Sequence, residues 1–118
     1  MALLNRINVV SGSTGTMTSQ GDYALGVSLP AGAKVLHIYF DETTNCAGSG
    51  TVQVQAAGAS GDVALTAAIA GGSVATGEVA VTNGFSIVEN SPLQVNVASD
   101  VLSDGALTVY VAYINAND

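Results

Sequence analysis

Apolar and polar side chains alternate along most of the chain, and a period of two is the pattern of a β-strand with one buried face. The alternation is cleanest in residues 23–29, 51–55 and 93–97, where Tyr, Leu or Val occupies every second position. Residues 34–41 differ because both of their faces are largely apolar, which favours a strand that is covered on two sides. These four segments predict a protein built from antiparallel β-strands.

Turn signals divide the last third of the chain into strand-sized segments. Asn83-Gly84 separates residues 79–81 from residues 85–88, and this dipeptide is typical of a tight hairpin turn with both central residues at positive φ. Asp104-Gly105 predicts a second hairpin turn, which leads into a final strand over residues 106–115.

The first thirteen residues differ from the rest. Residues 3–10 are apolar enough for a strand, and residues 11–15 are a turn-prone run of Gly, Ser and Thr. We therefore expect residues 1–13 to be an N-terminal arm or first strand, and residues 14–118 to form one domain. Eight strand candidates at regular spacing favour an all-β fold, an antiparallel β-sandwich that is jelly-roll-like.

Two segments between the strands carry no long alternation. Residues 41–50 are polar and predict a loop. Residues 56–72 are rich in Ala and Gly, and Asp62 is suited to cap a helix that starts at Val63. The repeated glycines favour a loop with one or two helical turns at most. The predicted core consists of the inward positions of the strands: Leu25, Val27, Leu36, Ile38, Phe40, Val52, Val54, Leu93, Val95, Val97, Val109 and Val111.

The chain is poor in charge, and its balance is acidic. Two of the 118 residues are Lys or Arg and nine are Asp or Glu, which gives a net charge of −7. Contact with nucleic acid or with an anionic membrane surface requires clustered cations, so we expect neither partner. The apolar start of the chain is interrupted by Asn5, Arg6 and Asn8, unlike the core of a signal peptide. We therefore expect the chain to be made in the cytoplasm of its host.

The side chains that usually carry catalysis are few and scattered. His37 is the single histidine, lies within a predicted strand and has no nucleophile motif around it. Cys46 is the single cysteine, so neither an internal disulfide nor the usual set of zinc ligands is available. Asp41 and Glu42 are adjacent carboxylates; solvated charge at a strand end is the simpler interpretation, and a calcium site with loop carbonyls is the alternative. We expect no enzyme and no cofactor.

Three stretches resemble small virion proteins of tailed bacteriophages. Residues 29–40 read LPAGAKVLHIYF, which is similar to the opening motif of those proteins. Residues 43–54 resemble the loop and strand that come next, and residues 105–114 resemble the final strand. The resemblance spans residues 25–115 and brings no catalytic residue with it.

The resemblance implies a capsid-associated β protein. The first hypothesis is a head decoration (cement) protein that binds the major capsid protein in the virion as a homo-oligomer. A trimer is favoured because decoration proteins commonly occupy threefold positions. The alternative is a head or tail fibre, or a receptor-binding module that recognises a glycan of the host surface through Tyr23, Tyr39 or Tyr110 at a sheet edge.

The N-terminal segment is the predicted contact with a partner. An edge strand has unpaired N–H and C=O groups, and lysines that would protect an edge are nearly absent from this chain. A neighbouring chain that covers the edge would replace that protection, and the cation of the segment would meet an acidic capsid group. The predicted contact residues are Leu3, Leu4, Arg6, Ile7 and Val9.

Overall fold

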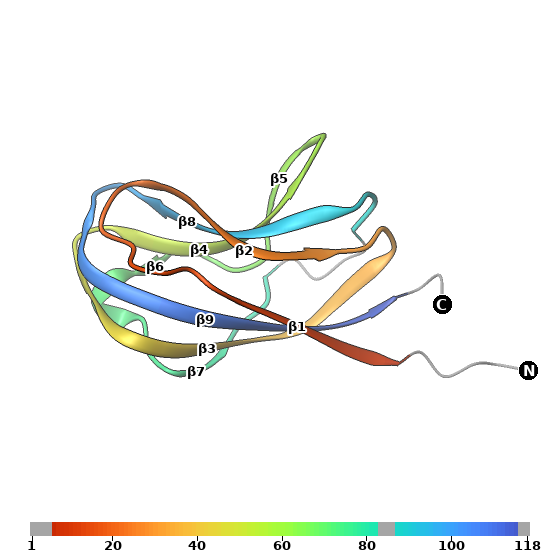
Figure 1. Cartoon of the computed structure of the whole chain (residues 1–118), viewed down its shortest axis with the longest axis horizontal. Helices are drawn as coiled ribbons and strands as arrows, with labels where there is room; N and C mark the ends of the chain where they lie inside the picture. Colours follow the sequence, from red (N-terminus) through yellow and green to blue (C-terminus); the bar gives the residue numbers. More distant parts are fainter. Residues whose placement is uncertain (1–5, 83–86, 116–118) are drawn as a thin grey trace, which may run out of the picture.

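Two antiparallel sheets pack face to face in the computed structural model, which describes residues 6–82 and 87–115 of the chain. Figure 1 shows the sheets as two layers. Sheet A has the order β1 (Ile7–Ser13), β9 (Leu102–Asn115), β3 (Ala33–Gly48) and β7 (Gly77–Val79). Sheet B has the order β2 (Gly21–Leu29), β8 (Ser91–Ala98), β4 (Thr51–Gly58) and β5 (Gly61–Ala64), and β6 (Ile69–Ala70) also pairs with β4.

The β-sandwich predicted from the alternation is confirmed. Residues 23–29, 51–55 and 93–97 lie within β2, β4 and β8, and residues 106–115 lie within β9. The described residues contain no α-helix, and their one helical turn is the 3₁₀ segment η1 (Gly71–Ser73). Small β-branched side chains dominate the strands because they pack well on a pleated, half-buried surface.

The core fills the space between the sheets with Val, Leu, Ile, Phe40 and Met17. Ten of the twelve predicted core residues are buried, and Val27 and Leu36 are only partly buried. Leu36 was predicted to face the core, and this prediction is wrong. The pairing of β3 with β9 shifts by one residue between Val35 and His37. A bulge of this kind reverses the alternation, so Val35 joins Ile38 in the core.

The two predicted loops are largely strands. β3 continues through residues 41–48, and β4 runs on to Gly58 before it turns into the short strand β5. Asp62 lies in β5, opposite Ala57 of β4, and caps no helix. Backbone pairing with β9 holds residues 41–48 in the sheet although most of their side chains are exposed. Because both faces of this part of β3 are largely exposed, its sequence has little hydrophobic alternation from which a strand could be predicted.

The hairpin turn predicted at Asp104-Gly105 lies elsewhere in the structure. Both residues lie inside β9, and the turn between β8 and β9 occupies residues 99–101, with Ser99 at φ 69°. Gly105 does have a positive φ, 155°, at one of the positions where the pairing of β9 with β3 is irregular. The predicted Asn83-Gly84 turn lies outside the described residues.

The two open sides of the sandwich differ. On one side β1 and β2 approach closely, since a Cβ atom added to Gly12 would overlap the carbonyl oxygen of Leu25. On the other side, β7 is paired with β3 only among the residues that the structure describes, and β5 and β6 are paired with β4. Within this part of the chain, β7 is therefore an edge strand of sheet A with one unpaired side.

Candidate interaction surfaces

The outer face of sheet A carries exposed apolar and aromatic side chains. Ile7 and Val9 of β1 are 66% and 61% exposed, and they lie opposite Ile114 and Ala112 of β9. Facing residues of paired strands share one side of a sheet, so these four side chains lie together. We call the following set the apolar face: Ile7, Val9, Tyr39, Tyr110, Ala112 and Ile114.

Tyr39 and Tyr110 form the aromatic part of the apolar face. They are directly opposite each other on β3 and β9, with ring centroids 6.2 Å apart and ring planes at 67°. This edge-to-face geometry holds both rings in place although each is substantially exposed. Isolated exposed apolar residues are ordinary, whereas a contiguous group of this kind is typical of an interaction surface.

Fixed charges surround the apolar face, and one of them, Glu78, lies beside Tyr39 on β7. Lys34 is opposite Ile114 in the sheet, and Arg6 precedes Ile7, so both cations of the chain lie at one end. Asp41, two residues after Tyr39 in the middle of β3, lies beyond the tyrosine pair at the other end of the apolar face. In a chain with a net charge of −7, this end is the one place where an acidic partner meets fixed positive charge.

Three of the five predicted contact residues are described by the structure. Arg6, Ile7 and Val9 are exposed, and Ile7 and Val9 are brought together with the tyrosine pair. Leu3 and Leu4 lie outside the described residues. β1 is paired with β9 over its whole length, so the residues from Ile7 onward belong to the sandwich.

His37 and Glu78 form an exposed pair beside the apolar face. Nδ1 of His37 lies 2.8 Å from Oε2 of Glu78, and both side chains are 64% exposed. The pair joins β3 to the edge strand β7 across the sheet. An ion pair in such an exposed setting contributes little to stability, about 0–1 kcal/mol, and it has no nucleophile beside it.

Cys46 is buried in β3 among core side chains. Burial, with the nearby Glu42 carboxylate as a second cause, raises the pKa of the Cys46 thiol to about 11. Because the thiolate is the reactive form, this cysteine is poorly suited to nucleophilic or redox chemistry near neutral pH. Among the described residues, no three His, Cys, Asp or Glu side chains are grouped as a metal site requires.

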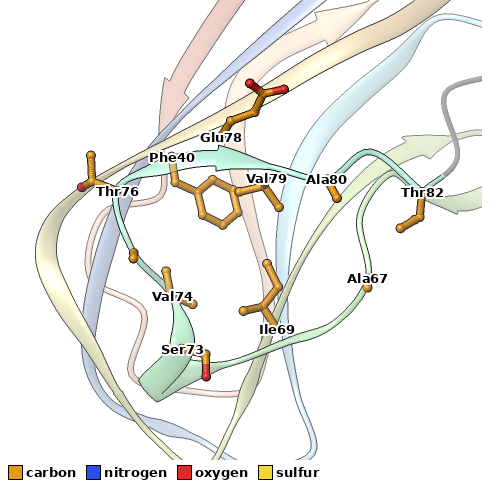
Figure 2. A pocket seen from close by; sticks show the side chains of 12 residues that line it. Phe40, Ala67, Ile69, Ser73, Val74, Thr76, Glu78, Val79, Ala80 and Thr82 are labelled. Atoms are coloured by element: carbon orange, nitrogen blue, oxygen red, sulfur yellow. The ribbon is translucent and has the colours of Figure 1, made fainter.

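An apolar pocket lies between the edge of sheet A and strand β6, next to β7. Its volume is about 360 Å³, at the lower end of the range for ligand pockets. Figure 2 shows Phe40, Ile69 and Val79 directed into the pocket, whereas Glu78 is directed away from it. Small side chains such as Ala67, Ala75 and Ala80 line the pocket as well and leave it open.

The outer face of sheet B is polar and held by amide hydrogen bonds. The amide of Gln94 donates to Oε1 of Gln55 at 2.8 Å, and that of Gln55 donates to Oε1 of Gln53 at the same distance. Asn96 donates to Asp22 at 2.8 Å on the neighbouring strand. The two outer faces therefore differ in chemistry: one is apolar and aromatic, and the other is a layer of hydrogen-bonded amides.

Of the three tyrosines considered for glycan binding, Tyr39 and Tyr110 lie together and Tyr23 lies apart from them. The Tyr23 side chain is partly buried against the core, and its hydroxyl donates to the carbonyl oxygen of Ser19 at 2.8 Å. Tyr39 and Tyr110 lie in the other sheet. The sequence did indicate Tyr39 as an exposed aromatic residue, because both faces of the predicted strand over residues 34–41 are apolar.

The pocket could not be predicted from any one stretch of sequence, since its lining comes from residues 40 and 67–82.

Comparisons with known proteins identify structural relatives only. No protein-family model matches the chain, and no curated protein sequence matches it. A chain of the acidic stable capsid structure of Helicobacter pylori bacteriophage KHP30 is similar in fold, with a TM-score of 0.67 and 14% identity, over 94% of this chain and 90% of the other. A chain of the capsid asymmetric unit of cyanophage Pam1 has a TM-score of 0.59 and 26% identity, over 98% of this chain and 89% of the other.

Proposed function

We propose that this chain is a structural protein of a phage virion that decorates the outer surface of the capsid. The observation that carries the proposal is the match to a capsid chain of cyanophage Pam1 at 26% identity over nearly the whole length of both chains. The likeness in fold to a KHP30 capsid chain points the same way. On this proposal the protein is made in the cytoplasm of the host and resides in the virion.

The architecture supports a capsid role. Sheets in the order β1-β9-β3-β7 and β2-β8-β4-β5 fit a jelly roll, an eight-stranded double sheet that recurs in viral capsid proteins. The scarcity of Lys and Arg leaves few sites for trypsin-like proteases on a long-lived particle. A structural rather than catalytic role is consistent with a buried thiol at Cys46 and with a histidine that is paired to Glu78.

The apolar face is the proposed contact with the major capsid protein. Its exposed residues Ile7, Val9, Tyr39 and Tyr110 supply area that gains free energy when water is removed. Arg6 and Lys34 at one end supply positive charge for an acidic group of the capsid. The amide layer of sheet B then faces solvent, which suits its hydrogen-bonded polar side chains. Several copies, in a trimer by analogy with other decoration proteins, multiply each weak contact through avidity.

The alternative proposal is a fibre or a receptor-binding module for a host glycan. The Tyr39–Tyr110 pair favours it, because two exposed aromatic rings offer apolar surface on which a sugar ring can pack. The two proposals differ in what the purified protein is expected to bind. A decoration protein binds capsids and ignores free host glycans, and a receptor-binding module does the reverse.

Binding to capsids tests the proposal. Purified protein is added to capsids that are assembled without it, and bound protein is measured after the particles are sedimented. Replacing Val9 with Asp or Tyr39 with Asp is expected to lower affinity at least tenfold, because each places a charge in an apolar contact. Val88→Asp is the matched control, since Val88 is 83% exposed and lies outside the apolar face. Equal binding by all variants would refute this contact.

A further inference from the structure

The pocket beside β7 adjoins an unpaired strand edge. Within the described residues, β7 is hydrogen-bonded to β3 alone, through pairs such as Tyr39 with Glu78 and Phe40 with Gly77. The apolar pocket lies next to β7 and includes Val79 and Val74 in its lining. A free edge next to an apolar pocket is the arrangement that accepts an added strand, whose backbone pairs with the edge while one side chain fills the pocket.

We propose that residues 3–6 of one copy pair with the free edge of β7 in a neighbouring copy, with Leu3 in the pocket and Arg6 against Glu78. The occupant is therefore a second copy of this chain. This interface lies at β7 and its test needs no capsid. Within the oligomer Arg6 is paired with Glu78, so Lys34 is the cation that remains for the capsid.

The alternation of a strand determines which leucine enters the pocket. In β7, Val79 is directed into the pocket and Glu78 is directed to the opposite side. Leu3 and Arg6 are three positions apart, so an extended segment places them on opposite faces. In a segment paired with β7, Leu3 therefore lies on the same side as Val79 and the pocket, and Arg6 lies on the same side as Glu78. Leu4 shares the face of Arg6 and stays outside the pocket.

Charge complementarity supports the same pairing. Arg6 is one of two fixed cations in the chain, and it is exposed at the end of the most apolar part of the N-terminal segment. Glu78 is 64% exposed, and its Oε2 atom lies 2.8 Å from Nδ1 of His37. A guanidinium that approaches the edge of β7 therefore meets an accessible carboxylate.

Distance excludes the pocket of the same copy. β1 and β7 are three strand positions apart in sheet A, which is about 14 Å, and the register places Ile7 about 13 Å along the strands from Glu78. These components give a separation of about 19 Å between Ile7 and Glu78. Leu3 is four residues before Ile7 and lies within about 14 Å of it even when fully extended. A segment paired with the free side of β7 lies one strand spacing beyond it, about 23 Å from Ile7, so Leu3 of the same copy does not reach that place.

A contact between two different surfaces of identical copies is heterologous. Each copy offers its N-terminal segment at one place and accepts another at β7, so the contacts continue until a ring closes. The expected product is a closed cyclic oligomer, which agrees with the threefold arrangement proposed for the capsid surface. The contact also protects the β7 edge, which has no lysine of its own.

The mass of the full-length protein tests the interface. Light scattering and sedimentation are measured over a wide concentration range for the parent, Leu3→Asp and the matched control Leu4→Asp. We expect Leu3→Asp to reduce the association constant at least 100-fold and Leu4→Asp to change it less than tenfold. Circular dichroism and thermal melting verify that each variant is folded. A parent that stays monomeric, or equal effects of the two substitutions, would overturn the proposal.

A charge exchange tests the contact between Arg6 and Glu78. Arg6→Glu and Glu78→Arg are each expected to weaken association several-fold, and the double variant is expected to recover most of the loss. Additive losses in the double variant would contradict direct pairing of the two residues.

Cross-linking tests whether the contact joins two copies. In a Cys46→Ala background, one preparation carries Leu3→Cys and another carries Ala80→Cys at the pocket. Oxidation of the mixture is expected to give a disulfide-linked heterodimer, and a Leu4→Cys preparation is expected to give much less. Equal yields from the two cysteine positions would refute the register. Because these measurements use no capsid, a failure here leaves the decoration proposal to be judged by particle binding alone.

Discussion

Gly105 of β9 lies directly against Cys46 of β3. A Cβ atom at Gly105 would lie 2.9 Å from the Sγ atom of Cys46, and the φ angle of 155° is one that other residues rarely adopt. Gly105→Val is therefore expected to destabilise the protein by about 2 kcal/mol, through crowding in the core and backbone strain.

A double-mutant cycle separates those two causes. Cys46→Ala removes the sulfur atom, so Gly105→Val is expected to cost about 1 kcal/mol less in that background. Gly72→Ala is the control because a Cβ atom there meets nothing within 4 Å. Urea denaturation measures each difference. A penalty for Gly105→Val that is the same in both backgrounds would mean that strain alone is responsible.

The Cys46 thiol makes the stability of the protein depend on pH. Its pKa is raised from 9.0 to about 11 in the folded protein, first by burial and then by Glu42. A raised pKa means that the folded state favours the neutral thiol, so this stabilisation is complete below pH 9 and is lost as the pH rises toward 11. The stability of Cys46→Ala is expected to fall less steeply than that of the parent over this interval. The urea midpoints of both proteins at pH 8 and pH 10.5 measure the effect. Parallel declines would contradict it.

At the scale of the elements, Gly12 determines how the β1 edge meets sheet B. A side chain at this position would collide with the backbone of Leu25. Gly12→Val is expected to separate β1 from β2 and to cost about 1–3 kcal/mol. Hydrogen exchange of the β1 amides detects the separation, because those amides lose protection before the rest of sheet A. If exchange and stability are unchanged, β1 does not need this close approach.

The strands with one buried face could be predicted from the sequence, and the others could not. In β4 and β8 each second residue enters the core, so the alternation of residues 51–55 and 93–97 determines their orientation. The bulge between Val35 and His37 depends on pairing with β9, which is remote in sequence. The same is true of residues 41–48, which are held by backbone hydrogen bonds to β9 while most of their side chains remain in solvent.

The candidate surfaces show the same limit. Ile7 and Val9 were predicted as contacts because an apolar N-terminal segment is visible in the sequence. Ile7 and Val9 lie on the same face as the Tyr39–Tyr110 pair only because β1, β9 and β3 are neighbours in one sheet. The pocket likewise needs β3, β6 and β7 together. Residue types were therefore predictable, and their grouping required the strand order.

At the scale of the whole molecule, the two sheets present opposite chemistries. Sheet A offers an apolar, aromatic face with both fixed cations at one end, and sheet B offers a layer of linked amides. A molecule with a net charge of −7 repels its own copies at long range, so short-range contacts must hold it on a lattice. The apolar face and the pocket at β7 are the two surfaces that are suited to this task.

The most direct test of capsid decoration is a cryo-electron microscopy structure of the virion that contains this protein. We expect copies of the sandwich on the outer surface of the head, with Val9, Tyr39 and Tyr110 against the major capsid protein and the amide layer of sheet B toward solvent. Copies found only on the tail, or head-bound copies with Val9, Tyr39 and Tyr110 in solvent, would contradict it.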